Sequence, residues 1–486
     1  MKLHELFFQR KFSVNLYQTL KLPVGEMSMY KDWVNDQRGD PYPVLHRRGD
    51  MTEQISDASY LLTSEEGGEI TRLLGAFFPY YTYAFQIAAD PAACDMGLTV
   101  CDRAGERRIS VMLCRGQEIV VQGGDACVHL PCRFSVSDTV IVTFRAGGVS
   151  IYADHGNRPE LIGDVPLDLL TEYLSYRVHA SATVGVTTRV YPKGKAAYRQ
   201  VESYLCGGIS QADMKPMTYE DGTPVMEGGR LFITFSARLE VGCYQGIMSW
   251  NPSLCDFRME GAMFFDTGDG QCCNDVAASV VYDRRAREWY LWVCSFSHGH
   301  VLARGRLKGD PRYGIQIVDV ALLPTWDGAD RTAFAGIKGD EDPDLALIDG
   351  KWHLTVCRLE PEDGYHYYRF VSDSPLDGFT FADRTPTGGK TGGLMIPFEG
   401  KYYFACGTDF KSRALYDVYP YDDFSRCDHL KCNFDDGGFR GWGSVIGVDI
   451  GSRKRYFWIT FDRHNGSGYN WSYGNIYVYE AEEYFA

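Results

Sequence analysis

The second half of the chain repeats one pattern, a short polar turn followed by a run of apolar and aromatic residues long enough for one strand. Five stretches share it: "VMEGGRLFITFSA", "VVYDRRAREWYLWVCSF", "ALIDGKWHLTVCR", "MIPFEGKYYFACG" and "GVDIGSRKRYFWITF". Their anchor residues are 50 to 63 positions apart and are Leu231, Trp289, Trp352, Tyr402 and Tyr456. A repeat of this length with a hairpin in each unit is typical of propeller blades. We expect a five-bladed β-propeller whose last segment, "GNIYVYEAEEY", pairs with the first blade to close the ring.

The first half has a shorter rhythm. From about residue 56 to residue 189, alternating or β-branched runs such as "RISVMLC" and "DTVIVTFRAGGVSIYAD" are separated by Gly and Asp turns. Such runs predict a β-sandwich, and in order and style they resemble laminin-G or concanavalin-like sandwiches. We therefore expect an all-β protein with two domains. A β-sandwich domain takes residues 1–205, with its core at about 56–189, and the propeller takes residues 206–486.

Composition narrows the range of partners. A formal charge of −15 over 486 residues disfavours nucleic acid as a ligand, because no basic surface is present to neutralise phosphates. The N-terminal residues do not form a signal peptide and no 18 apolar residues run together, so we expect a cytoplasmic protein with no membrane partner. The fifteen cysteines form no CxxC pair, and the sequence indicates no cofactor and no metal site. A neutral ligand such as a carbohydrate fits this composition, and a homo-oligomer is compatible with it.

Three blades carry an aspartate just before the repeated hairpin. They are Asp213 in "QADMKP", Asp275 in "CCNDVAAS" and Asp342 in "GDEDPDL". The innermost strand of a blade runs along the central channel, so residues at matched positions should meet at one mouth of it. An isolated Asp is most often a turn residue, but three in register predict one site.

Carboxyl groups that meet in this way suit the cleavage of a glycosidic bond. One carboxyl must protonate the leaving oxygen while another activates water or attacks the anomeric carbon. Crowding of like charges away from water raises a carboxyl pKa, which keeps the acid protonated near neutral pH. The stretch from Asp340 to Asp344 holds four carboxylates in five residues and fits this need.

The repeat and its aspartates resemble the five-bladed glycosidase superfamily that includes glycoside hydrolase families 32, 43, 68, 117 and 130. The resemblance covers the last 280 residues or so and implies hydrolysis of a short oligosaccharide or glycoside. It implies that Asp213 is a general base or nucleophile and that Asp342, followed by Pro343, supports acid chemistry. The run Glu341-Asp342-Pro343 is similar to the family 130 pattern, in which the Asp donates a proton.

This chain departs from the family patterns at two positions that bear on the identity of the general acid. Family 130 continues with Arg where this chain has Asp344, and families 32, 43 and 68 carry a fourth-blade Glu where this chain has "GGKTGG". The acid must then be Glu341, Asp342 or Asp275, with His298 and His366 in reserve. Glu341 is the leading candidate, and we expect Asp344 to turn away because Pro343 marks the start of its strand.

Aromatic and basic residues near the strand ends would complete a sugar site. The candidates are Arg238, His298, Trp326, Lys390, Arg440 and Trp442. Two alternatives stay open. One is a phosphorylase of the family 130 type, with Lys390 and Arg440 as phosphate ligands, and the other is a propeller that binds carbohydrate without catalysis.

Overall fold

A computed structural model describes residues 1–27, 43–56, 59–323, 338–360, 362–408, 416–433, 443–461 and 474–482. The chain divides into two compact units. One unit is Lys21–Cys206, and the other joins Met1–Leu20 to Gly207–Ala486. Among the described residues, no helix is long and apolar enough to cross a membrane.

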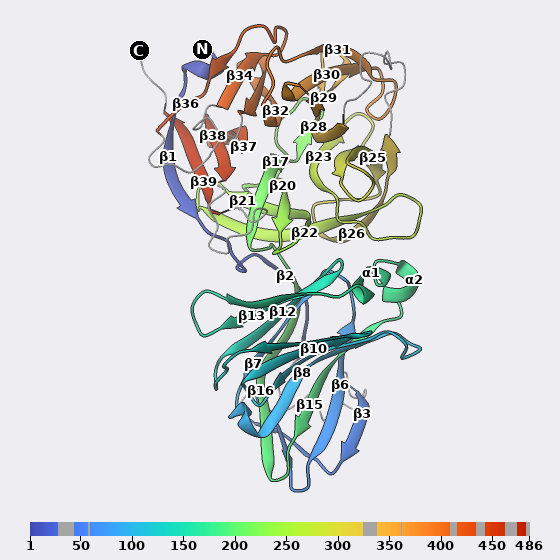
Figure 1. The fold of residues 1–486 in the computed structure, drawn as a ribbon. Helices are drawn as coiled ribbons and strands as arrows, with labels where there is room; N and C mark the ends of the chain where they lie inside the picture. The colour runs from blue at the N-terminus through green and yellow to red at the C-terminus, as the bar shows by residue number, and fades with distance from the viewer. Residues whose placement is uncertain are drawn as a thin grey trace. The chain divides into compact units, whose positions relative to one another are not determined.

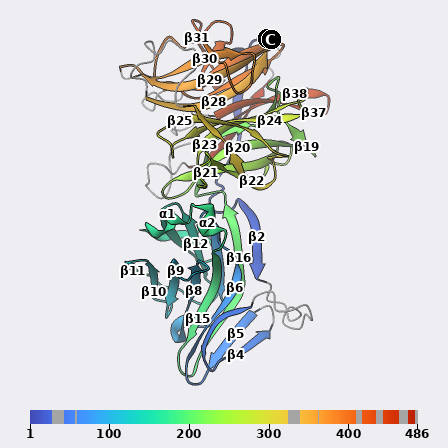
Figure 2. The same ribbon diagram turned by 90° about the vertical axis from the view of Figure 1, so that its right-hand side faces the viewer.

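The unit Lys21–Cys206 is a β-sandwich of two antiparallel sheets (Figure 2). In sheet order, one contains β11 (Ala126–Pro131), β10 (Glu118–Gly123), β9 (Arg108–Cys114), β8 (Cys94–Cys101), β15 (Thr183–Val190), β6 (Gly68–Ala76) and β3 (Val44–Gly49). The other contains β14 (Glu160–Pro166), β13 (Gly148–Asp154), β12 (Thr139–Arg145), β7 (Thr82–Ile87), β16 (Gly194–Cys206), β5 (Ser59–Ser64) and β4 (Thr52–Ser56), with β2 (Lys21–Met27) beside β16. The short helices α1 (Leu169–Glu172) and α2 (Tyr176–His179) precede β15.

Alternation of buried and exposed residues builds the core of this sandwich. In β9, Ile109, Val111 and Leu113 are buried, and they share one hydrophobic cluster with Val142 and Ile151 of the other sheet. The expected core at residues 56–189 was too short. It omits β2, β3 and β4 at one end and β16 at the other, although β16 lies inside the eight-stranded sheet.

The second unit is a five-bladed β-propeller, as its repeat predicts. Blade one contains β17 (Ser210–Pro216), β20 (Arg230–Arg238), β21 (Cys243–Asn251), β22 (Asp256–Asp266) and β26 (Gly314–Asp319), with β19 (Met226–Glu227) beside β20. Blade two contains β18 (Thr218–Tyr219), β23 (Val276–Asp283), β24 (Glu288–Ser295), β25 (Val301–Leu307) and β27 (Ala321–Leu323). Blade three contains β28 (Lys338–Ile348), β29 (Lys351–Glu360), β30 (Gly364–Ser372) and β31 (Thr380–Arg384), and blade four contains β32 (Thr391–Phe398), β33 (Lys401–Gly407), β34 (Tyr416–Pro420) and β35 (Asp428–His429).

The five anchors of the repeat all lie near the start of the second strand of a blade, which is β20, β24, β29, β33 or β38 (Arg453–Phe461). The innermost strands are β17, β23, β28, β32 and β37 (Gly443–Ile450), and each contacts the next around the ring. Figure 1 shows them grouped at the centre of this unit. Apolar clusters between neighbouring blades hold the ring together.

The N-terminal residues complete blade five. Its order is β36 (Lys431–Cys432), β1 (Phe7–Val14), β39 (Ile476–Glu482), β38 and β37, so β1 pairs antiparallel with β39. Phe8 of β1 and Leu3 of the 3-10 helix η1 (Leu3–Glu5) are fully buried in the core of this blade. Two expectations were therefore wrong. Residues 1–20 do not belong with the sandwich, and the last strand pairs with β1 and β38 instead of the first blade.

Candidate active site

A bulge recurs at the same place in four innermost strands and aims the side chains of the site. The pairing with the second strand shifts between Ala212 and Lys215, between Val276 and Ser279, between Glu341 and Asp344, and between Thr391 and Leu394. In each bulge the first extra residue has positive φ, and these residues are Asp213 (51°), Ala277 (58°), Asp342 (48°) and Gly392 (61°). Residues other than glycine are uncommon in this region, and they concentrate at functional sites.

Asp213 is held by its own blade. Oδ2 of Asp213 accepts hydrogen bonds from Oγ of Ser236 at 2.5 Å and from Nη2 of Arg238 at 2.8 Å. Both donors belong to β20, the strand beside it, and the carboxylate keeps 16% of its surface exposed. Asp213 is thus a charged, oriented carboxylate that water or a ligand can reach.

Asp342 is more deeply buried. Its Oδ2 accepts hydrogen bonds from the backbone N–H of Gly392 at 2.9 Å and from Oγ1 of Thr391 at 3.1 Å, both in blade four. Burial raises the pKa of Asp342 to about 6, although Lys215 lowers it; the charge of Asp213 also raises it. Asp342 and Asp213 are therefore close enough to influence each other, and Asp342 can hold a proton near neutral pH.

Lys215 and Asp344 lie beside Asp342. Nζ of the buried Lys215, in blade one, donates a hydrogen bond to the backbone oxygen of Pro343, in blade three, at 2.8 Å. Asp344 accepts hydrogen bonds from the backbone N–H of Met395 at 2.7 Å and from Oγ of Ser279 at 3.2 Å. Burial raises the pKa of Asp344 to about 6, and Lys215 opposes that rise. Asp344 is thus buried between three blades.

The expectation that Pro343 starts its strand, from which we predicted that Asp344 turns away, was wrong. Strand β28 runs through Pro343 because this residue sits in the bulge, where no ladder hydrogen bond needs its missing N–H. Pro343 therefore does not start the strand, and both Asp342 and Asp344 interact with the ammonium of Lys215.

Glu341 has a different set of contacts. Its Oε1 accepts a hydrogen bond from the hydroxyl of Tyr365 at 2.7 Å and lies 2.8 Å from Nε2 of His300. The ring of His300 stacks on Phe296, with ring centroids 4.5 Å apart and 29° between the planes. Phe296 is 44% exposed, which is unusual for so large an apolar side chain. Phe296 is thus an exposed aromatic ring linked to Glu341 through His300.

Asp275 does not occupy the position that the sequence predicts. The equivalent of Asp213 and Asp342 in blade two is Ala277, and Asp275 lies two residues earlier, just before β23. It is fully buried, and its Oδ1 accepts a hydrogen bond from the backbone N–H of Ser297 at 3.3 Å. Its Oδ2 has no hydrogen-bond partner among the described residues. Burial raises the pKa of Asp275, which makes it a second group able to carry a proton.

Two thiols, Cys294 buried and Cys243 half-buried, lie near these carboxyl groups. Burial raises the pKa of the Cys243 thiol, and the charges of Asp213 and Asp275 add to the rise. Burial likewise raises the pKa of the Cys294 thiol, with additions from four nearby carboxylates, Glu341, Asp342, Asp275 and Asp340. Each of the four residues expected to carry catalysis thus lies near one of these thiols, and Asp275 lies near both.

Of the residues expected to bind the ligand, two lie beside the carboxylates. Arg238 contacts Asp213, and Nδ1 of His298 lies 3.0 Å from Oγ of Ser295, beside Asp275. Lys390 instead pairs with the buried Asp417 of β34. Three further candidates, Trp326, Arg440 and Trp442, lie outside the described residues.

Several residues of the site had no separate signal in the sequence. Five of them are brought to the site only by the folding of the propeller. They are Lys215, Ser236, His300, Tyr365 and Phe296. Lys215 follows Asp213 by two residues, so its place in the repeat could have indicated it. His366, the reserve candidate for the acid, is fully buried. Its Nε2 lies 2.9 Å from Oδ2 of Asp363, and its Nδ1 lies 2.9 Å from the backbone oxygen of Thr385.

No protein-family model matches the chain, and no curated protein matches its sequence. Among solved structures it is similar to a family 43 β-1,3-galactosidase with galactodeoxynojirimycin, at 13% identity and a TM-score of 0.37 over 55% of this chain and 93% of that chain. It is also similar to a family 117 glycoside hydrolase from Zobellia galactanivorans, at 11% identity and a TM-score of 0.38 over 56% and 84%. The carbohydrate-binding module CBM66 from Bacillus subtilis matches at 11% identity and a TM-score of 0.25 over 34% and 94%. These neighbours are two glycoside hydrolases and a carbohydrate-binding module.

Proposed function

We propose that the propeller unit is a glycoside hydrolase in which Asp342 is the general acid and Asp213 is the general base or nucleophile. The observation that carries the proposal is the pair itself. Two carboxyl groups occupy equivalent bulges, one bound by a guanidinium and partly exposed, the other buried with a pKa of about 6. Two carboxyl groups in environments that differ in this way suit one acid and one base.

The steps follow from this division. The protonated carboxyl of Asp342 donates its proton to the oxygen of the glycosidic bond as the bond to the anomeric carbon breaks. The carboxylate of Asp213 either removes a proton from a water that attacks that carbon, or attacks the carbon directly. In the second case a water, whose proton the Asp342 carboxylate takes, then breaks the bond between Asp213 and the sugar. Arg238 and Ser236 hold Asp213 in a single orientation during the step. The leaving group departs as a neutral alcohol.

Asp342 replaces Glu341 as the leading candidate for the acid. The carboxylate of Glu341 is already engaged at Oε1, which accepts a hydrogen bond from Tyr365 and lies against His300. Asp342 keeps Oδ1 without a hydrogen bond from the described residues, because both of its donors approach Oδ2. Asp275 is the second candidate, since its Oδ2 has no described partner.

The substrate is a carbohydrate with at least one apolar ring face. Phe296 offers an exposed aromatic surface beside His300 and Glu341, and sugar rings stack on such surfaces. The proposal includes a cytoplasmic location, to which the absence of disulfides among all fifteen cysteines, each of them described, lends support. A homo-oligomer remains compatible with it.

The two alternatives have less support. A phosphorylase needs cations that are free to hold phosphate, but the Lys390 ammonium is already paired with Asp417. A binding protein without catalysis would not need two strained aspartates with separated environments.

Turnover of a panel of aryl glycosides and unactivated oligosaccharides tests the proposal, with sugar binding measured by calorimetry on the same panel. We expect at least one hydrolysed sugar, with turnover that does not depend on added phosphate. A sugar that binds but is never cleaved would identify a binding protein, and a rate that requires phosphate would identify a phosphorylase.

A further inference from the structure

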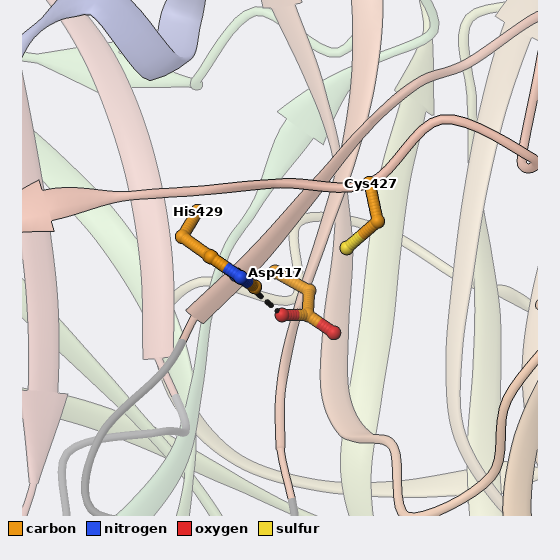
Figure 3. Close-up of side chains that lie close together, drawn as sticks. All are labelled: Asp417, Cys427 and His429. Carbon is orange, nitrogen blue, oxygen red and sulfur yellow. Dashed lines mark hydrogen bonds and ion pairs between the residues drawn. The ribbon is translucent and has the colours of Figure 1, made fainter.

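A second group of polar side chains lies on the outer strands of blade four, away from the bulges. Asp417 belongs to β34, and His429 is its cross-strand partner in β35. Cys427 precedes His429 by two residues, a spacing that brings two side chains to one face of an extended chain. Figure 3 shows the three side chains directed toward one another.

The donor atoms of these residues are close together. One atom of each, a carboxylate oxygen, a thiol sulfur and an imidazole nitrogen, lies within 4.8 Å of the other two. Nδ1 of His429 is 2.9 Å from Oδ1 of Asp417. Ligands at about 2.0–2.3 Å from a tetrahedral Zn²⁺ are roughly 3.3–3.7 Å from each other. The observed spacing therefore requires only a small adjustment, which the exposed side chains of His429 and Cys427 can supply.

We propose that Asp417, Cys427 and His429 form a binding site for Zn²⁺ or a divalent ion of similar chemistry. Thiolate, imidazole and carboxylate are the three ligand types that Zn²⁺ takes from proteins, and a water would complete four ligands. Ca²⁺ and Mg²⁺ fit poorly, because they prefer six or more oxygen ligands and this group offers one carboxylate.

The surroundings of Asp417 define which oxygen faces the ion. The ammonium of Lys390 and, at 3.4 Å, the hydroxyl of Tyr419 approach Oδ2, which leaves Oδ1 on the side of His429. Asp417 is only 2% exposed, so its position is fixed by packing while the other two ligands lie at the surface. Lys390 thus orients the buried ligand, a role of the kind that outer contacts have at metal sites.

An ion at this place would fasten the edge of the blade. Strand β35 is two residues long and is joined to β34 by only two residue pairs, Asp417 with His429 and Val418 with Asp428. A bond from the ion to each strand would add a link that two ladder pairs cannot provide. The site is independent of the glycosidase proposal, since none of its ligands contacts Asp213 or Asp342.

The test is a zinc titration of the full chain by calorimetry, with bound metal counted after dialysis. We expect one equivalent of zinc, and a loss of affinity of at least about tenfold to a hundredfold in both His429→Ala and Cys427→Ser. His155→Ala and Cys255→Ser replace an exposed histidine and an exposed cysteine elsewhere and should bind zinc as the wild type does.

A second measurement uses Co²⁺, whose visible spectrum reports a thiolate ligand. Wild-type protein should give the thiolate band, Cys427→Ser should lose it, and Asp213→Asn should keep it. Absence of stoichiometric binding in the folded wild type would overturn the proposal. Equal binding by wild type, His429→Ala and Cys427→Ser would also overturn it, because the ion would then lie elsewhere.

Discussion

Asp213 and Asp342 occupy equivalent positions in two different blades. Each is the first extra residue of the bulge in an innermost strand, with φ of 51° and 48°, and in blade four Gly392 takes that place. A left-handed backbone at a residue other than glycine costs on the order of 1–3 kcal/mol. The bulge thus aims both carboxyl groups at a local cost in stability, and the charge of one raises the pKa of the other.

Replacing Asp213 by Asn should remove most turnover and leave the fold intact. The amide keeps the shape but can neither accept a proton from water nor attack carbon, so kcat should fall by about a hundredfold to ten-thousandfold. Steady-state kinetics and thermal unfolding check this. Asp373→Asn, a change at a carboxylate that is 84% exposed, is the control. Wild-type kcat in folded Asp213→Asn would contradict the role.

The rate should depend on the proton of Asp342. Its carboxyl acts as acid only while protonated, so kcat/KM should fall as the pH rises above about 6. Asp342→Asn should lose most activity on unactivated glycosides and much less on aryl glycosides, whose leaving groups need little protonation. If that variant keeps the wild-type alkaline limb, Asp275 becomes the acid to test.

Asp344 should lower stability at high pH. Its folded-state pKa of about 6 exceeds the ordinary value of 3.8, so its favourable contribution is fully present below about pH 4 and is lost as the pH rises through 6. A shift of this size corresponds to at most about 3 kcal/mol. Asp344→Asn should therefore match the wild type in unfolding free energy at pH 4 and exceed it at pH 8. A variant that is less stable at pH 8 than at pH 4, relative to the wild type, would refute this.

Phe296 should matter for binding more than for chemistry. Removing its ring in Phe296→Ala should raise KM about threefold to tenfold while kcat changes little, because stacking is made equally with substrate and transition state. Phe381→Ala removes another ring that is 44% exposed, on the edge strand of blade three, and should have no effect on KM. Equal KM for both variants and the wild type would remove Phe296 from the site.

The N-terminal strand should stabilise the propeller alone. Phe8 is fully buried in blade five, so Phe8→Ala should cost about 3–5 kcal/mol. Calorimetry should show a lower unfolding temperature for the propeller and an unchanged one for the sandwich. Lys11→Ala, on an exposed position of the same strand, is the control. A shift confined to the sandwich would contradict the assignment of residues 1–20.

The sequence predicts the blades well because each second strand carries its own local signal. Leu231, Trp289 and Trp352 each follow a polar turn and begin an apolar run, and a hairpin needs no distant information. The pairing of β1 with β39 has no such signal. It joins Phe7 to Glu482, and nothing in "FFQRKFSV" indicates a partner so far along the chain.

The site was less predictable, since its geometry depends on bulges. Asp275 and Asp213 both stand shortly before a repeated hairpin in the sequence, but in blade two an alanine, Ala277, takes the left-handed position of the bulge. An alanine in the sequence does not indicate positive φ, so the predicted position was wrong by two residues. Burial was equally hidden, and it raises the pKa of Asp342 to about 6.

The pairing of β1 with β39 also has a consequence for biosynthesis. Residue 14 leaves the ribosome long before residue 476, and at about 5–20 residues per second the interval is on the order of half a minute to a minute and a half. Residues 21–206 can complete their own sheets during that time, whereas β1 lacks both of its sheet neighbours. Until β36 and β39 have been made, its two adjacent phenylalanines have no blade to enter. Blade five therefore cannot close before the last strand is synthesised, and until then these side chains lack their native neighbours.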